Sequence, residues 1–256
     1  MFDIGVNLDQ PAYLDDLDLF RKEYNEAGVK GIICIASHLE EARQILSHCA
    51  PYHDMQVTLG CHPHHASSWT NDHFNILQTM FTNHSKAVAV GETGLDFNRN
   101  YSTPDEQIYA FEQQLKLAEA VKKPLFLHER DAQDTMIKML SNADLSAGGV
   151  IHCFTGDEDT MQAYLSLGLH VGITGWLLDE RRNEAIQQAV KSLPLDRLLL
   201  ETDAPYLTPR NIRPRPKRNH PKYLSYIAAE IARIKDLDVS QVIEAANQNT
   251  RTLFSV

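Results

Sequence analysis

The chain has 256 residues, of which 43% are apolar and 23% charged, and its formal net charge is −10. This composition is typical of a folded globular protein of one large α/β domain and excludes a disordered chain. No stretch approaches the roughly 18 uninterrupted apolar residues that a membrane span needs. The amino-terminal stretch MFDIGVNLDQ lacks a basic region followed by an apolar run, so we expect no secretory signal.

Eight short apolar runs alternate with helical patterns along the entire chain. Their nearly continuous apolar character is typical of parallel strands covered on both faces. Between two of them, residues 104–121 form an amphipathic stretch that opens with Thr103 as an N-cap and Pro104 at the first helical position. Eight repeated strand–helix units predict an α/β fold, a closed (β/α)8 TIM-type barrel, and with no composition break we expect residues 1–256 to form one domain. The runs are residues 2–7, 31–37, 56–63, 87–92, 124–129, 149–154, 170–175 and 198–202.

Carboxylate and imidazole groups stand where several of these runs end, which is where such barrels carry their active sites. The fourth run ends in Glu92, the fifth ends at His128, the sixth contains His152, and Asp203 follows the eighth. Each alone has a structural explanation, such as a hydrogen-bonded histidine or a turn-forming aspartate. Together they form an O/N ligand set that suits Mg²⁺, Mn²⁺ or Zn²⁺, and a metal would offset the cost of placing Glu92 at the rim of an apolar barrel.

Other histidines and the cysteines are read as structural. Cys153 follows His152 and on a strand would point away from it, so we leave it out of the ligand set. The scattered cysteines, without a Cys-x-x-Cys pair, are typical of reduced thiols and favour a cytoplasmic location. The cysteines are Cys34, Cys49, Cys61 and Cys153, and the histidines read as incidental are His38, His48, His53, His73, His84 and His170.

Residues 209–222, PRNIRPRPKRNHPK, hold six of the 24 basic side chains and no acid. On charge alone, a solvated basic loop and a local anion-binding segment are equally good interpretations. If the chain handles nucleic acid, this loop would attract the phosphate backbone despite the acidic chain. Trp176 and Tyr206 are candidates for stacking a terminal base, although packing at the rim is the favoured interpretation for each.

Several segments resemble signature segments of the TatD-type metal-dependent deoxyribonucleases, a family of amidohydrolase-like barrels. The resemblance extends from Phe2 to Phe254 and implies a TIM-type barrel, a divalent metal (Mg²⁺ first, with Mn²⁺ or Zn²⁺ as alternatives) and hydrolysis of DNA phosphodiester bonds. It further implies an exonuclease that works from the 3′ end, favours single-stranded DNA and accepts RNA. We expect a monomer with no membrane partner. The segments are GETGLDFNRN, LHERDA, IHCFTG and LLLETDAPYL, together with GCHPH, GITGW and KRNHP.

By this resemblance the metal ligands are Glu92, His128 and His152, with Asp203 as a metal-facing carboxylate and catalytic base. The metal would lower the pKa of bound water and neutralise a phosphate oxygen, and Asp203 would accept the water proton. The substrate phosphate would be contacted by His62 and His64, from the CHPHH segment, and by Arg130.

The chain departs from the family pattern at two places. Most members begin with Asp-x-His-x-His, whose histidines bind one of two metals, whereas here Gly5 and Asn7 follow Asp3. We therefore expect one tightly held metal and a loose second one. His220 stands where a glutamate is usual, which puts the role of that acid in doubt.

Two other functions remain open from the residues. The same barrel and ligands serve metal-dependent hydrolases of small C–N or ester substrates. A nucleic-acid-binding protein that lost catalysis is the non-enzymatic alternative. The basic loop argues against the first, and the complete set of Glu92, His128, His152 and Asp203 argues against the second.

Overall fold

The computed structural model of this chain describes residues 1–8 and 11–256. Asp9 and Gln10 lie outside the described residues. They end the amino-terminal stretch in which we expect no secretory signal. The chain forms two compact units, each assembled from segments that are distant in sequence. The first unit consists of Met1–Cys34, His152–Leu165 and His170–Val256, and the second of Ile35–Ile151 and Ser166–Leu169.

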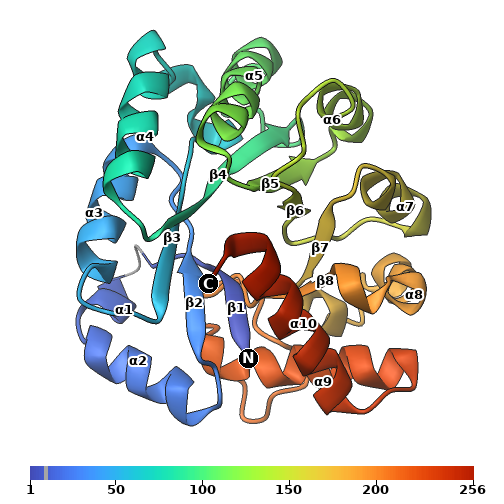
Figure 1. Cartoon of the computed structure of the whole chain (residues 1–256). Helices are drawn as coiled ribbons and strands as arrows, with labels where there is room; N and C mark the ends of the chain where they lie inside the picture. The colour runs from blue at the N-terminus through green and yellow to red at the C-terminus, as the bar shows by residue number, and fades with distance from the viewer. Residues whose placement is uncertain (9–10) are drawn as a thin grey trace. The chain divides into compact units, whose positions relative to one another are not determined.

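The second unit is built on a parallel sheet in which β4 pairs with β3 and β5, and β5 pairs with β6. Every residue of β4 is buried, as expected for a strand covered on both faces. The helices of this unit lie along the sheet (Figure 1). The strands are β3 (Met55–Leu59), β4 (Ala87–Asp96), β5 (Leu125–Arg130) and β6 (Gly149–Ile151), and the helices are α3 (Leu39–Cys49), η1 (Pro63–Ser68), α4 (Asn71–Asn83), α5 (Pro104–Val121) and α6 (Gln133–Leu140).

In the first unit, β1 pairs in parallel with β2, and β7 pairs in parallel with β8. The carboxyl-terminal helix α10 packs against β1 and β8 (Figure 1). The strands are β1 (Phe2–Val6), β2 (Gly31–Cys34), β7 (His170–Ile173) and β8 (Leu198–Leu200). The helices are α1 (Pro11–Leu14), α2 (Leu17–Glu26), α7 (Glu158–Ser166), η2 (Gly175–Leu178), α8 (Glu184–Ser192), η3 (Leu195–Arg197), η4 (Pro221–Tyr223), α9 (Leu224–Lys235) and α10 (Val239–Phe254).

The segment that follows β8 lies beside β1 and is fastened to it by hydrogen bonds. The Asp203 amide donates to the Gly5 carbonyl at 3.0 Å, and the Asn7 amide donates to the Ala204 carbonyl at 2.8 Å. The buried Asp3 carboxylate accepts hydrogen bonds from the Thr202 amide at 2.9 Å and the Thr202 hydroxyl at 2.6 Å. These contacts fix the position of the LLLETD segment.

All eight predicted strands are present in the described chain, but the carboxyl end of each differs from the predicted run. β4 continues past Glu92 to Asp96, and β5 continues past His128 to Arg130, so the prediction that these two residues end their strands was wrong. The register of β4 against β5 shifts between Val90 and Thr93. Gly91 has a φ of +155°, and a Cβ on it would lie 2.3 Å from the Phe126 carbonyl oxygen, so only glycine lets the strand continue through this shift.

β6 is shorter than predicted, because it ends at Ile151 and leaves His152 and Cys153 beyond the strand. Cys153 has a φ of +47°, and its sulfur lies 3.8 Å from the Thr174 hydroxyl. The alternation argument that separated Cys153 from His152 therefore does not apply here. All four cysteines are thiols, as predicted. Within residues 1–8 and 11–256, the helices are too short or too polar to span a bilayer.

The expectation of one domain gives a prediction for thermal unfolding. Because each unit is assembled from separated segments, neither is a continuous piece of chain that could fold alone. We expect calorimetry and circular dichroism to report a single transition with equal calorimetric and van't Hoff enthalpies. Two resolved transitions would contradict a single domain.

Candidate active site

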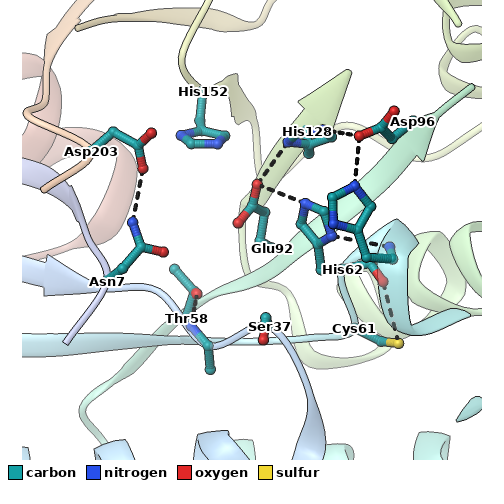
Figure 2. A network of polar contacts seen from close by, with 12 residues as sticks. Asn7, Ser37, Thr58, Cys61, His62, Glu92, Asp96, His128, His152 and Asp203 are labelled. Carbon is teal, nitrogen blue, oxygen red and sulfur yellow. Dashed lines mark hydrogen bonds and ion pairs between the residues drawn. The ribbon is translucent and has the colours of Figure 1, made fainter. Parts of the chain in front are cut away.

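Histidines cluster around Glu92 in the second unit (Figure 2). The Oε1 atom of Glu92 lies 2.9 Å from His128 Nδ1 and 3.4 Å from His62 Nε2. Glu92 and His62 are buried, and His128 is half-buried. One ligand atom from each of the three residues lies within 4.8 Å of the others. Glu92 and His128 offer the O and N donors that fit a divalent cation, which would also compensate the charge of Glu92 inside an apolar strand.

The hydrogen bonds of His62 indicate which of its ring nitrogens carries the proton. Its Nδ1 atom accepts the backbone N–H of His64 at 3.0 Å, so the proton lies on Nε2, which faces Glu92. Burial lowers the pKa of His62 to about 4, although the nearby Glu92 carboxylate opposes that shift. His62 is therefore a neutral ring at neutral pH. Its Nε2–H is suited to donate to a carboxylate or phosphate oxygen more than to hold a metal.

Asp96 is a buried carboxylate that the sequence reading missed. Its Oδ2 atom lies 2.7 Å from His64 Nε2 and 3.6 Å from His128 Nε2. Its Oδ1 atom accepts the amide of Arg99 at 2.9 Å. Burial raises the pKa of Asp96, but the nearby His128 and the hydrogen bonds from the Arg99 amide and His64 outweigh it and hold that pKa below the usual range. Asp96 is therefore a stable negative charge that binds His64 and faces His128.

Helix α5 fixes the backbone that carries these groups. As predicted, it begins with Thr103 as N-cap and Pro104 in the first turn. Gln114 accepts the Cys61 amide at 2.7 Å and donates to the Cys61 carbonyl at 3.0 Å. Gln107, two turns earlier on the same buried face, accepts the Asp96 amide at 2.8 Å and donates to its carbonyl at 3.0 Å. The two glutamines thus hold the segments that lead into the histidines and end β4.

In the first unit, the predicted ligand His152 contacts a carboxylate that the sequence reading did not select. Its Nδ1 atom lies 3.1 Å from Oε2 of Glu201, and the other oxygen of Glu201 accepts the Cys153 amide. Glu201 is fully buried. A carboxylate on Nδ1 fixes the proton there and gives Nε2 the lone pair that a metal ligand needs. Glu201 is therefore a positioning residue for His152.

Glu201 also explains the glycine at position 5. A Cβ on Gly5 would lie 2.5 Å from Glu201 Oε2, and a Cβ on Gly172 would lie 2.4 Å from Glu201 Oε1. The carboxylate thus fills the space beside two glycines, and no side chain fits at position 5 while Glu201 stays in place. A histidine is excluded here by packing against Glu201. The backbone conformation of Gly5 does not itself require glycine.

Asn7, which stands with Gly5 in the first departure, binds the predicted base (Figure 2). Its side-chain Nδ2 donates to Oδ1 of Asp203 at 2.9 Å and reaches the Ala204 carbonyl at 3.3 Å. Asp203 has a φ of +53°, a left-handed conformation that is uncommon outside glycine. The asparagine therefore holds the carboxylate in one orientation, a role that its residue type alone did not suggest.

Arg130, the remaining predicted substrate contact, and His220, the second departure from the family pattern, also have definite positions. Arg130 is exposed at the last position of β5. Tyr101, which was not selected from the sequence, is 69% exposed and lies edge-on to His64, with ring centroids 4.8 Å apart. His220 is buried, caps η4 by accepting the Lys222 amide at 3.1 Å, and lies 3.2 Å from Glu23. Burial lowers the pKa of His220 to about 4, and the neutral ring is held between the Lys222 amide and Glu23.

Some cations of the basic loop bind other groups of the protein, and others are exposed to solvent. The Arg213 guanidinium bonds the carbonyls of Arg210 and Ile212 in its own loop. Lys222 pairs with Glu23 at 3.0 Å. The side chains of Arg215, Lys217 and Arg218 are exposed to solvent.

Relatives of this chain are already named for an activity. A protein of Klebsiella pneumoniae (strain 342) is 42% identical over 259 residues, covering 100% of this chain and 98% of the relative. One of Edwardsiella piscicida is 43% identical over 258 residues, covering 99% of each chain. Both are named 3′–5′ ssDNA/RNA exonuclease TatD.

Solved structures show the same architecture. The TatD homologue YjjV of Escherichia coli K12 superposes with a TM-score of 0.92 at 29% identity, covering 100% of this chain and 98% of that one. An organophosphorus hydrolase of Deinococcus radiodurans, with a TM-score of 0.63 at 16% identity over 99% of this chain and 91% of that one, shares the fold alone. These likenesses confirm the predicted (β/α)8 TIM-type barrel.

The sequence also matches the family described as TatD related DNase over residues 2–255, which confirms the resemblance drawn from its motifs. With this match and with identities above 40% along the whole chain, the protein belongs to the TatD related DNase family.

Proposed function

We propose that this chain is a divalent-metal-dependent nuclease that removes nucleotides from the 3′ end of single-stranded DNA and also acts on RNA. The observation that carries the proposal is the contact of Glu92 with His128, with His62 beside them as a phosphate contact. It occurs in a chain whose full-length relatives are named 3′–5′ ssDNA/RNA exonucleases. The exposed cations of the basic loop agree with a polyanionic substrate.

As metal ligands we propose Glu92, His128, His152 and Asp203, and as the metal Mg²⁺, with Mn²⁺ or Zn²⁺ as alternatives. When bound, such an ion supplies positive charge to a phosphate oxygen and makes water more acidic. Support comes from the donor types, from the contact between Glu92 and His128, and from the carboxylate on His152 Nδ1.

The other residues have roles that follow from their contacts. Asp203 is the proposed base, because Asn7 binds one carboxylate oxygen and so orients the group to accept a proton from water. His62 would donate its Nε2–H to the scissile phosphate. His64, which Asp96 orients, would contact the same phosphate. Arg130 would bind the phosphate through its planar guanidinium.

The test is a turnover assay with single-stranded DNA labelled at either end, with and without Mg²⁺ or Mn²⁺. A ladder shortened stepwise from the 3′ end, abolished by chelation, is the expected result. The second candidate is a metal-dependent hydrolase of a small C–N or ester substrate, because the same barrel and ligands serve that chemistry, so p-nitrophenyl esters should be assayed in parallel. Ester hydrolysis without DNA cleavage would favour the esterase, and binding without either would indicate a nucleic-acid-binding protein.

The metal content should follow from the residues at positions 5 and 7. Neither Gly5 nor Asn7 provides an imidazole, and Asn7 binds Asp203 instead. We expect one ion per chain to survive dialysis, with any second ion lost and recovered only with added Mg²⁺ or Mn²⁺. Metal analysis after dialysis measures this, and two retained ions per chain would show the prediction to be wrong.

The basic loop should contribute to binding through salt-sensitive phosphate contacts. Replacing Arg215, Lys217 and Arg218 with alanine should weaken oligonucleotide binding and flatten its salt dependence. Each lost contact should remove about 0.7 from the slope of log K against log salt on a single strand. Titrations at several salt concentrations measure the slope, and an unchanged slope would leave the loop as a solvated surface.

We also propose that the protein is a monomer and that it is cytoplasmic. The thiol state of its cysteines supports the location. Light scattering after gel filtration should return the mass of one chain. A dimer mass would contradict the monomer, and co-fractionation with membranes would contradict the location.

A further inference from the structure

A hollow of about 180 Å³ lies in the first unit between two loops that carry arginines. One loop follows η2, and the other is the start of the basic loop. Arg210 and Arg215 belong to the basic loop, and the other lining residues have no part in the metal or phosphate binding proposed above. We call it the arginine pocket, and the side chains that matter in it are Trp176, Asp179, Arg181, Arg182, Arg210 and Arg215.

Asp179 organises the pocket. It is 4% exposed, and it binds Arg181 in bidentate fashion, with Nε–Oδ1 at 2.8 Å and Nη2–Oδ2 at 2.6 Å. Arg182 Nε lies 3.0 Å from Oδ2, and Arg210 Nε lies 3.6 Å from Oδ1. Hydrogen bonds from Arg181, opposed by burial, hold the pKa of Asp179 below its usual range, so it is ionised. One carboxylate thus draws arginines from both loops together.

The pocket keeps a large excess of positive charge. Arg215 also lines it, so four guanidinium groups face a single carboxylate and three positive charges remain. Each guanidinium has five N–H donors. Arg181 uses two of them on Asp179 and Arg182 uses one, whereas Arg210, at 3.6 Å, forms only an ion pair. The remaining donors suit an anion with several oxygens.

The shape of the pocket narrows the choice of anion. Arg182 lies over the ring of Trp176, with its Cζ atom 3.5 Å from the centroid, and the indole donates to the Arg182 carbonyl at 3.3 Å, so these two residues form one wall. The volume is that of about six waters at about 30 Å³ each, which is room for a phosphodiester group with its ester oxygens. Planar guanidinium groups match phosphate oxygens in bidentate geometry.

We propose that the arginine pocket is a second phosphate site, which holds a backbone phosphate of the single-stranded substrate other than the one that is cut. This inference rests on the proposed nuclease function. Arg210 and Arg215 belong to the basic loop, so the strand that the loop attracts would reach the pocket along a continuous run of cations. The site would raise the affinity for strands long enough to reach it and leave the shortest substrates unaffected.

The test compares two double variants of the same loop that remove the same charge. Arg210→Gln with Arg215→Gln alters the pocket, and Lys217→Gln with Arg218→Gln alters exposed cations outside its lining. Both are made in the Glu92→Gln chain so that strands stay intact. Fluorescence anisotropy then measures the dissociation constant for strands of increasing length, and for strands in which one phosphate at a time is a neutral methylphosphonate.

We expect one internal methylphosphonate position to weaken binding of the Glu92→Gln chain about tenfold or more. In the pocket variant, the methylphosphonate at that position should no longer weaken binding, and only long strands should bind less tightly than to the Glu92→Gln chain. In the control variant, the methylphosphonate at that position should still weaken binding. A position effect that persists in the pocket variant, or no sensitive internal position, overturns the inference. If the double variant folds poorly, Arg215→Gln alone carries the same comparison, because Arg215 does not hold Asp179.

The two proposals fail in different ways. A chain that shortens DNA but shows no position-specific loss overturns the second phosphate site alone. A chain that neither binds nor cuts any strand overturns the nuclease function and the pocket together.

Discussion

Replacing Glu92 with glutamine is expected to reduce metal-dependent turnover by about 10²–10⁴-fold, the range for a group that takes direct part in the catalytic chemistry. The amide keeps the size of the side chain but loses its charge, and its NH₂ cannot act as a ligand. Both His128 and His62 face Oε1 of Glu92 at 2.9 and 3.4 Å, so this charge is the centre of the cluster. Initial rates at saturating Mg²⁺, together with metal analysis of the purified variant, measure the effect.

A matched control lies on the neighbouring strand. Glu129 follows His128 in β5, and its carboxylate accepts the Ala132 amide at 2.8 Å without a proposed role in chemistry. Glu129→Gln should keep turnover within a few-fold of the parent chain. If Glu92→Gln retained wild-type-like activity in a preparation with an unchanged melting curve, Glu92 would not be a metal ligand.

Introducing the missing histidine as Gly5→His is expected to destabilise the protein by more than about 3 kcal/mol and to leave the metal content no higher. The new Cβ would lie 2.5 Å from Glu201 Oε2, and Gly172 blocks the other side of that carboxylate. Overpacking of a buried site typically costs about 1–3 kcal/mol, and here the ring must be accommodated as well. Moving Glu201 would also remove the partner of His152 Nδ1, and the loss of such a partner typically weakens metal binding about 10–100-fold.

A double-mutant cycle isolates the cause. Gly5→Ala adds only the Cβ, and its cost in denaturant unfolding should fall clearly when Glu201 is already alanine, because the clashing oxygen is gone. Equal costs in both backgrounds would show that Glu201 is not what restricts position 5. A Gly5→His chain that folds normally and retains a second ion would show that the space beside Glu201 can accept the histidine.

The sequence by itself determined the strands and the start of α5. Buried parallel strands are continuous apolar runs, so all eight could be located from local composition. The capping box at Thr103 is likewise a signal that lies within four residues. The motif around Glu92 and the histidine of LHERDA indicated the metal chemistry because these residue types are rare in apolar strands.

Only the tertiary structure decided which side chains share a volume. Glu201 binds His152 across 49 residues of chain, and Asn7 binds Asp203 across 196. The same packing explains Gly5, which the sequence presented as a missing ligand. In each case the determining contact joins segments that are distant in sequence. Close packing of distant segments sets such contacts, and no local propensity or periodicity encodes which distant side chain will fill a given space.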